Sequence, residues 1–197
     1  MDRIAMIIFF ILLASFLSDL ISKIYITQFE ENSYRISNIW YVISYFLSIW
    51  LAYQLVPQFK KWVVALLIFF IVGGVISFFF YSLNESNTFI RVYSSLTLII
   101  IPLMIYMGLL RLPSGPLFRN PVFWIATAFF IYGCITLLKN LFTQLLVFDL
   151  KVSYEAFYAV AVVNIIANIT KNVLLLYSLL LIKKEHSTGI KTSMTDD

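Results

Sequence analysis

The sequence predicts an all-α, polytopic integral membrane protein: a bundle of six transmembrane helices with both termini in the cytoplasm. Three observations predict this fold class. The 197-residue chain is 61% hydrophobic and 12% charged, whereas about 25% of the residues in a typical soluble domain are charged. Six apolar runs are each long enough to cross the hydrocarbon core of a bilayer, which takes about 20 helical residues. Lysine and arginine are concentrated in alternate loops, as in proteins that cross a membrane several times.

The six runs are joined by short polar links. They do not alternate in polarity as the strands of a membrane β-barrel do. We therefore expect a single six-helix domain over residues 1–183 and a flexible polar cytoplasmic tail over residues 184–197. The expected spans lie near residues 4–26, 36–56, 62–82, 90–111, 121–147 and 156–182.

The first three spans each have a distinguishing residue. The first begins after Arg3 and is similar to a signal peptide, but its apolar run is long and no small-x-small cleavage site follows, so we expect a retained helix. Trp40 is expected at the outer boundary of the second span, where tryptophan anchors helices in the interface. Gly73 and Gly74 should allow a neighbouring helix to approach the third span closely.

Prolines mark the fourth and fifth spans. Pro102 removes a backbone donor in the middle of the fourth and should kink it. Before the fifth span, Asn120 is placed to cap the helix and Pro121 to occupy its first position.

The basic residues of the loops predict the orientation. Eight lie on one side of the expected bundle and four on the other. By the positive-inside rule the richer side is cytoplasmic, which places both termini inside and agrees with an even number of spans. The richer side has Arg3, Lys60, Lys61, Arg111, Arg119, Lys183, Lys184 and Lys191. The other side has Lys23, Arg35, Arg91 and Lys151.

The sixth span carries polar side chains where lipid is expected. Asn164, Asn168, Lys171 and Asn172 fall within a stripe roughly 100° wide at the helical spacing. Lys171 lies about 3 Å from the bilayer centre, counted at the helical rise. A charge at that depth costs at least about 2.5–3.5 kcal/mol unless it is paired or hydrated. Something other than lipid should therefore face this stripe.

Two further charges lie at a similar depth. Asp19 in the first span and Lys139 in the fifth are both about 6–7 Å to the outer side of the centre. Lys139 and Lys171 would then hold the carboxylate between them, and the excess positive charge would attract a small anionic ligand. Two alternatives stay open: Asp19 pairs with Lys23, four residues on, or Lys139 extends to the outer headgroups.

Catalytic and cofactor motifs are missing from the sequence. The single cysteine, Cys134, and the single histidine, His186, exclude a multi-cysteine or histidine-based metal site in the membrane, and no Gly-x-Ser-x-Gly motif occurs. We expect no enzyme activity, no cofactor and no metal. The net charge of +4 has a topological explanation, so we expect no nucleic-acid partner.

The polar side chains at this depth, the short links and the absence of catalytic motifs favour a receptor-like or signalling module that binds a small ligand or a partner helix in an outward-facing cavity. A small transporter or channel, with Lys171 and Asp19 on an ion path, is the alternative. A structural subunit of a membrane complex is a third. Besides the lipid bilayer, a membrane-protein partner or a second copy of the chain is therefore expected.

Four motifs carry a resemblance over about half of the chain. "NPVFWIATAFFIYGCITLL" and "VVNIIANITKNVLLLYSLLL", with "LLASFLSDLI" and "NIWYVISYFLSIW", resemble spans of an uncharacterised family of small multi-pass membrane proteins from Bacteroidota. The resemblance implies a bacterial inner-membrane protein and implies no activity. It makes Asp19, Asn168, Lys171 and Asn172 the family's polar positions, whereas Ser44 stands where many members have Glu.

Overall fold

Every regular element in the described part of the chain is helical. The computed structural model describes residues 3–29, 34–81, 87–111, 116–143 and 154–188. Six of the helices are long and apolar enough to span a membrane, so the prediction of an all-α chain with six such helices is confirmed. They are α1 (Arg3–Phe29), α2 (Tyr34–Leu55), α3 (Lys60–Phe80), α4 (Thr88–Arg111), α5 (Pro121–Thr143) and α6 (Tyr154–Thr188), with the short 3₁₀ turns η1 (Pro57–Phe59) and η2 (Leu117–Arg119) before α3 and α5.

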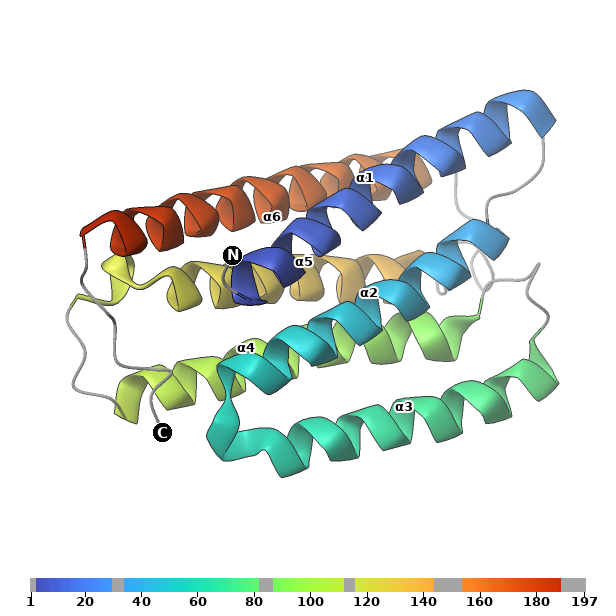
Figure 1. The fold of residues 1–197 in the computed structure, drawn as a ribbon. Helices are drawn as coiled ribbons and strands as arrows, with labels where there is room; N and C mark the ends of the chain where they lie inside the picture. The colour runs from blue at the N-terminus through green and yellow to red at the C-terminus, as the bar shows by residue number, and fades with distance from the viewer. Residues whose placement is uncertain (1–2, 30–33, 82–86, 112–115, 144–153, 189–197) are drawn as a thin grey trace.

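The helices form two layers of three (Figure 1). One layer is the consecutive series α1, α2 and α3, and the other is the series α4, α5 and α6. Helix α4 packs against both α2 and α3, whereas α1 approaches α6. The first and last helices of the chain therefore lie side by side and run in opposite directions (Figure 1).

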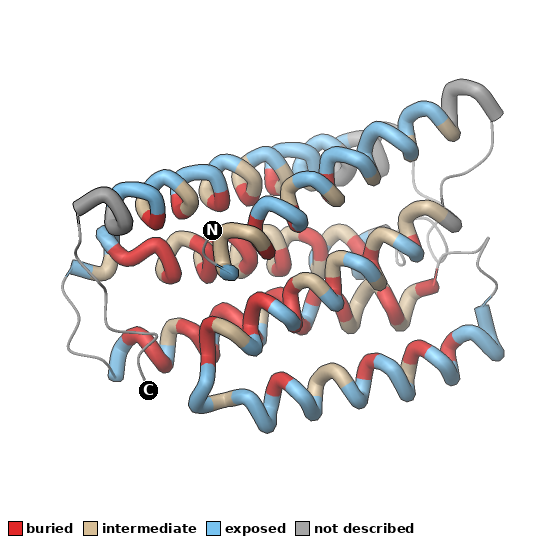
Figure 2. The backbone as a smooth tube through the Cα atoms, viewed as in Figure 1, coloured by how far each residue is buried: buried red, intermediate tan, exposed pale blue. Residues whose placement is uncertain are grey.

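Helix α4 is at the centre of the bundle and α3 at its edge (Figure 2). The packing of α4 on α5 depends on Gly133, because a Cβ atom there would lie 2.9 Å from the backbone carbonyl of Leu98. Both helices bury apolar side chains along this contact, among them Leu98, Ile105, Ile125 and Phe129. Helices α4 and α5 are therefore closely packed against each other in the second layer.

Two tyrosine hydroxyls attach α3 to its neighbours. Tyr45 of α2 and Tyr93 of α4 both donate to the backbone oxygen of Leu66, over 2.8 and 3.2 Å. The Tyr45 ring also stacks on Phe70, with 3.7 Å between centroids. The predicted close approach at the two glycines is confirmed for Gly73, where a Cβ would clash with the ring of Phe89, and is wrong for Gly74, where a Cβ would have nothing within 4 Å.

Asparagine side chains begin two helices. The Oδ1 atom of Asn120 accepts from the backbone N–H of Val122 over 2.9 Å, which confirms the predicted cap of α5. Asn87 caps α4 in the same way, accepting from the N–H of Ile90 over 3.1 Å. Its Nδ2 also donates to Oγ of Ser77 over 2.9 Å, so this cap also joins α3 to α4.

The helix ends differ from the predicted bounds by a few residues. Helix α6 continues past residue 182 to Thr188 and is followed in the sequence by Gly189, the residue type most common just beyond a helix end. Helix α5 ends at Thr143. The rest of its predicted span, to residue 147, lies outside the described residues, as does most of the predicted tail. Helix α4 continues as a helix through Pro102.

Candidate functional site

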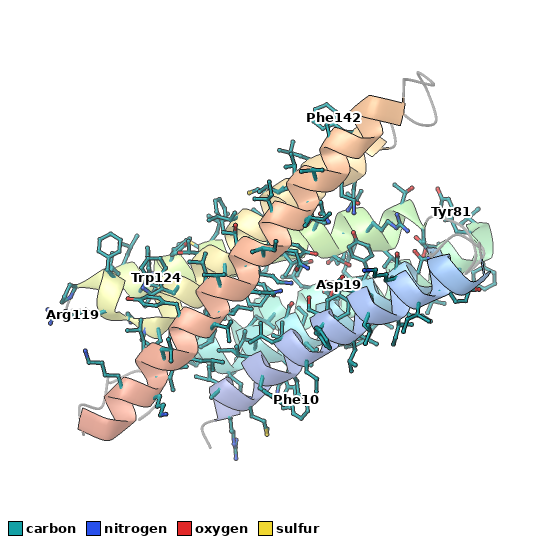
Figure 3. The ribbon with its side chains drawn as sticks, turned by 90° about the horizontal axis from the view of Figure 1, so that it is seen from above. Phe10, Asp19, Tyr81, Arg119, Trp124 and Phe142 are labelled. Carbon is teal, nitrogen blue, oxygen red and sulfur yellow. The ribbon has the colours of Figure 1, made fainter. Side chains whose placement is uncertain are left out.

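A polar cluster joins the first helix to the last. Asn168 of α6 donates from Nδ2 to Oδ2 of Asp19 on α1, over 3.1 Å. Residues 15 and 19 are one helical turn apart, and so are residues 168 and 171, so each pair shares a face of its helix. Figure 3 shows Asp19 on the side of α1 toward α6, in the angle where the two helices diverge. The structure therefore brings together Asp19, Asn168 and Lys171, which the sequence predicted as site residues.

Lys171 is buried, with 3% of its surface exposed. Its ammonium nitrogen lies 4.3 Å from the centre of the Tyr132 ring on α5, within the range of a cation–π interaction. The same nitrogen lies 3.5 Å from Oγ of Ser15, which is a long hydrogen bond. An aromatic face and a hydroxyl group thus surround this ammonium group.

The counter-charge of Lys171 is Asp19. The two groups attract each other electrostatically, although their direct hydrogen bonds go to other side chains. They differ in accessibility, because Asp19 is exposed whereas Lys171 is buried. A molecule approaching the cluster from outside the bundle therefore meets the carboxylate before the ammonium group.

Unused hydrogen-bond acceptors line this face of α6. The Oδ1 atoms of Asn164, Asn168 and Asn172 are buried and have no hydrogen-bond partner among the described residues. For Asn168 the orientation of the amide is determined by chemistry, because an ionised carboxylate accepts hydrogen bonds and donates none. Its Nδ2 must face Asp19, so its Oδ1 is an unused acceptor. Buried acceptors of this kind are normally paired with a donor from the protein, from water or from a ligand.

Lys139 does not join this cluster. It is half-buried on α5, and its ammonium group has no hydrogen bond or ion pair with any residue in the described ranges. Tyr132, seven residues earlier and on the same face of α5, occupies the position next to Lys171. Two helical turns, about 10 Å along the axis, separate the two α5 residues. The sequence predicted that two lysines flank Asp19. The structure places Lys171 near Asp19 and leaves Lys139 outside the cluster.

The bundle is apolar on the other side of the cluster, toward the end where α1 begins. Ile7, Ile8 and Ile11 of α1 are at most 3% exposed, and Leu175 of α6 is fully buried. Ser178 is also buried there, but its hydroxyl donates to the backbone oxygen of Leu175 over 2.7 Å. Of these five residues, four are apolar and the hydroxyl of the fifth, Ser178, is already hydrogen-bonded.

Two polar contacts were missing from the predicted site. Tyr132 covers Lys171; the sequence places it on the same face of the fifth span as Lys139, but it was not among the predicted site residues. Asn140 of α5 donates to Oγ of Ser95 over 3.1 Å and to the backbone oxygen of Arg91 over 3.3 Å. This second contact joins α4 to α5 and lies next to Lys139 in the chain.

Comparison of the chain with protein-family models, with curated proteins and with solved structures finds no match. The resemblance to a Bacteroidota family accordingly stays a prediction. The residues of the cluster are the remaining basis for a functional assignment.

Proposed function

We propose that the chain is a non-enzymatic, multi-pass protein of the bacterial inner membrane that binds a small ligand between α1 and α6, as a receptor-like or signalling module. The observation that carries this proposal is the exposed carboxylate of Asp19, hydrogen-bonded by Asn168, within two helices long enough to cross a bilayer. A carboxylate facing lipid at this depth is costly. Water, a ligand or a partner must therefore cover it.

The distribution of basic residues gives the orientation of the proposed site. With both termini in the cytoplasm, α1 ends and α6 begins at the outer surface. The cluster then lies toward the outside, and the apolar half that contains Ile8 and Leu175 lies toward the cytoplasm. Polar side chains on one side and a packed apolar half on the other are the arrangement expected of a binding site rather than a continuous pore.

Ligand-induced stabilisation tests the proposal. A ligand that binds the folded state raises thermal stability, so the purified protein should be melted in detergent with a panel of sugars, amines, organic acids, zwitterions and lipids. At least one class should stabilise the wild type and not the Asp19→Asn variant. The matched control is Lys139→Met, which removes a membrane lysine outside the cluster and should keep the response. The absence of any stabilisation across the panel would contradict the proposal.

Transport is the second candidate, and accessibility separates the two. A transporter opens its site alternately to both sides, so a cysteine placed at Ser178, in a background with Cys134 replaced, should be labelled by a water-soluble thiol reagent in one state. Ser178 is fully buried. Consistent protection at residue 178, with labelling at residue 19, favours the binding module. Labelling at both positions favours transport.

A further inference from the structure

We propose that the ligand of this site carries a primary ammonium group, and that this group competes with Lys171 for the charge of Asp19. The inference rests on the proposed function and names the chemical class of the ligand. It differs from the anion expected from the sequence, because the structure leaves Lys139 out of the cluster and buries Lys171.

The accessible charge at the site is negative. Asp19 is exposed, whereas Lys171 is covered by the Tyr132 ring and by Ser15. An anion entering between α1 and α6 would meet the carboxylate first and be repelled by it, while a cation would be attracted. The order in which a ligand meets the two charges thus favours a cation.

Next to Asp19, the unused hydrogen-bonding atoms are acceptors. Asn168 uses Nδ2 for Asp19 and leaves Oδ1 without a described partner. Asp19 uses Oδ2 for this bond, and an ionised carboxylate has further lone pairs on both oxygens. A primary ammonium group has three N–H donors and can reach several acceptors at once. A quaternary ammonium group has the charge but no donor, so it should bind weakly.

Lys171 has the same chemistry as the proposed ligand. Its ammonium group is held by the electrostatic attraction of Asp19, by the face of Tyr132 and by a long contact to Ser15. Tyr132 itself interacts electrostatically with Tyr41 of α2 and with Asp19. A ligand ammonium would therefore compete with Lys171 for Asp19. Removing the lysine charge should strengthen ligand binding.

A matched set of four-carbon probes tests the class. n-Butylammonium, n-butanol and n-butyrate share a butyl chain and differ in charge and in hydrogen-bonding groups, and tetramethylammonium has the charge without N–H donors. Thermal shifts at constant ionic strength should show stabilisation by n-butylammonium alone. The response should disappear in Asp19→Asn, because the attracting charge is lost, and should persist in Lys139→Met.

The lysine variant tests the competition. Lys171→Met should bind n-butylammonium more tightly, by about tenfold, which is within the usual range of coupling between two binding events. Lys171→Gln provides the same test with a side chain that keeps hydrogen-bonding capacity, in case the methionine variant does not fold. Unchanged or weaker binding in a folded variant would show that Lys171 does not compete with the ligand.

The failure of this inference differs from the failure of the proposed function. If n-butyrate or n-butanol stabilises the wild type and this response needs Asp19, the site binds a ligand but the ammonium class is wrong. Equal stabilisation by tetramethylammonium would show that charge alone is recognised, which also overturns the inference. If no probe and no member of the wider panel acts, both the inference and the proposed function are overturned.

Discussion

The side chain of Asn168 donates a hydrogen bond to the carboxylate of Asp19 over 3.1 Å, across the interface between the last helix and the first. This contact, the long hydrogen bond from Lys171 to Ser15 and the attraction between Asp19 and Lys171 connect α1 to α6 through polar groups. Elsewhere α1 packs mainly on α2, and α6 mainly on α5. The stability of the α1–α6 interface should therefore depend on a small number of polar side chains.

A double-mutant cycle should detect the coupling of Asp19 and Lys171. Residues that interact directly usually show coupling energies of about 0.5–3 kcal/mol, and the exposure of Asp19 places this pair toward the lower end. Thermal unfolding in detergent should thus show a smaller loss for Asp19→Asn with Lys171→Met than the sum of the single variants. The same cycle with Lys139→Met is the control and should be additive. Additivity in both cycles would mean that Asp19 and Lys171 act independently.

Reporter fusions should read the topology directly. We expect cytoplasmic signals from fusions after residues 58, 115 and 190, and external signals after residues 31, 86 and 150, because the basic residues lie in alternate links. An alkaline phosphatase and green fluorescent protein pair gives opposite responses at each point. If two neighbouring fusions gave the reverse of the expected signals, the predicted number of spans would be too high.

Two glycines should respond in opposite ways to an added methyl group. In Gly133→Ala the new Cβ would meet the backbone of Leu98 at 2.9 Å, and overpacking of this kind typically costs about 1–3 kcal/mol. In Gly74→Ala the Cβ has no other atom within 4 Å, and alanine favours a helix by about 1 kcal/mol over glycine. The first variant should melt at a lower temperature than the wild type and the second at the same or a higher one. Equal melting temperatures for the two variants would contradict the close packing of α4 on α5.

The tyrosine pair on Leu66 should show partial redundancy. Tyr45 and Tyr93 both donate to the backbone oxygen of Leu66. In Tyr45→Phe this oxygen therefore still accepts a hydrogen bond from Tyr93. We expect each phenylalanine variant to lose about 0.5–1.5 kcal/mol of stability, the usual net value of a hydrogen bond, and the double variant to lose more than the sum. Tyr53→Phe, at an exposed position of α2, the helix that contains Tyr45, is the matched control and should change the stability little. A strictly additive result would show that the two hydroxyls do not share the acceptor.

The sequence was sufficient to predict the helices and part of the site. Length and hydropathy locate a span because the thickness of a bilayer fixes how many residues it needs, and the cap at Asn120 follows from local chemistry. The face shared by Asn168 and Lys171 followed from helical spacing alone. The partners across the helices did not, because they depend on how α1, α5 and α6 rotate about their axes. Lys139 and Tyr132 share one face of α5, and only packing decides that Tyr132 lies opposite Lys171.

The contact between α1 and α6 also has a consequence for biosynthesis. Asn168 follows Asp19 by 149 residues, so at usual translation rates the ribosome reaches it roughly 7–30 s after Asp19. During that interval Asp19 lacks the hydrogen bond from Asn168 and the counter-charge of Lys171. A chain that stops after the fifth helix would never acquire these partners, so α1 would keep a carboxylate without them in the membrane, which is costly.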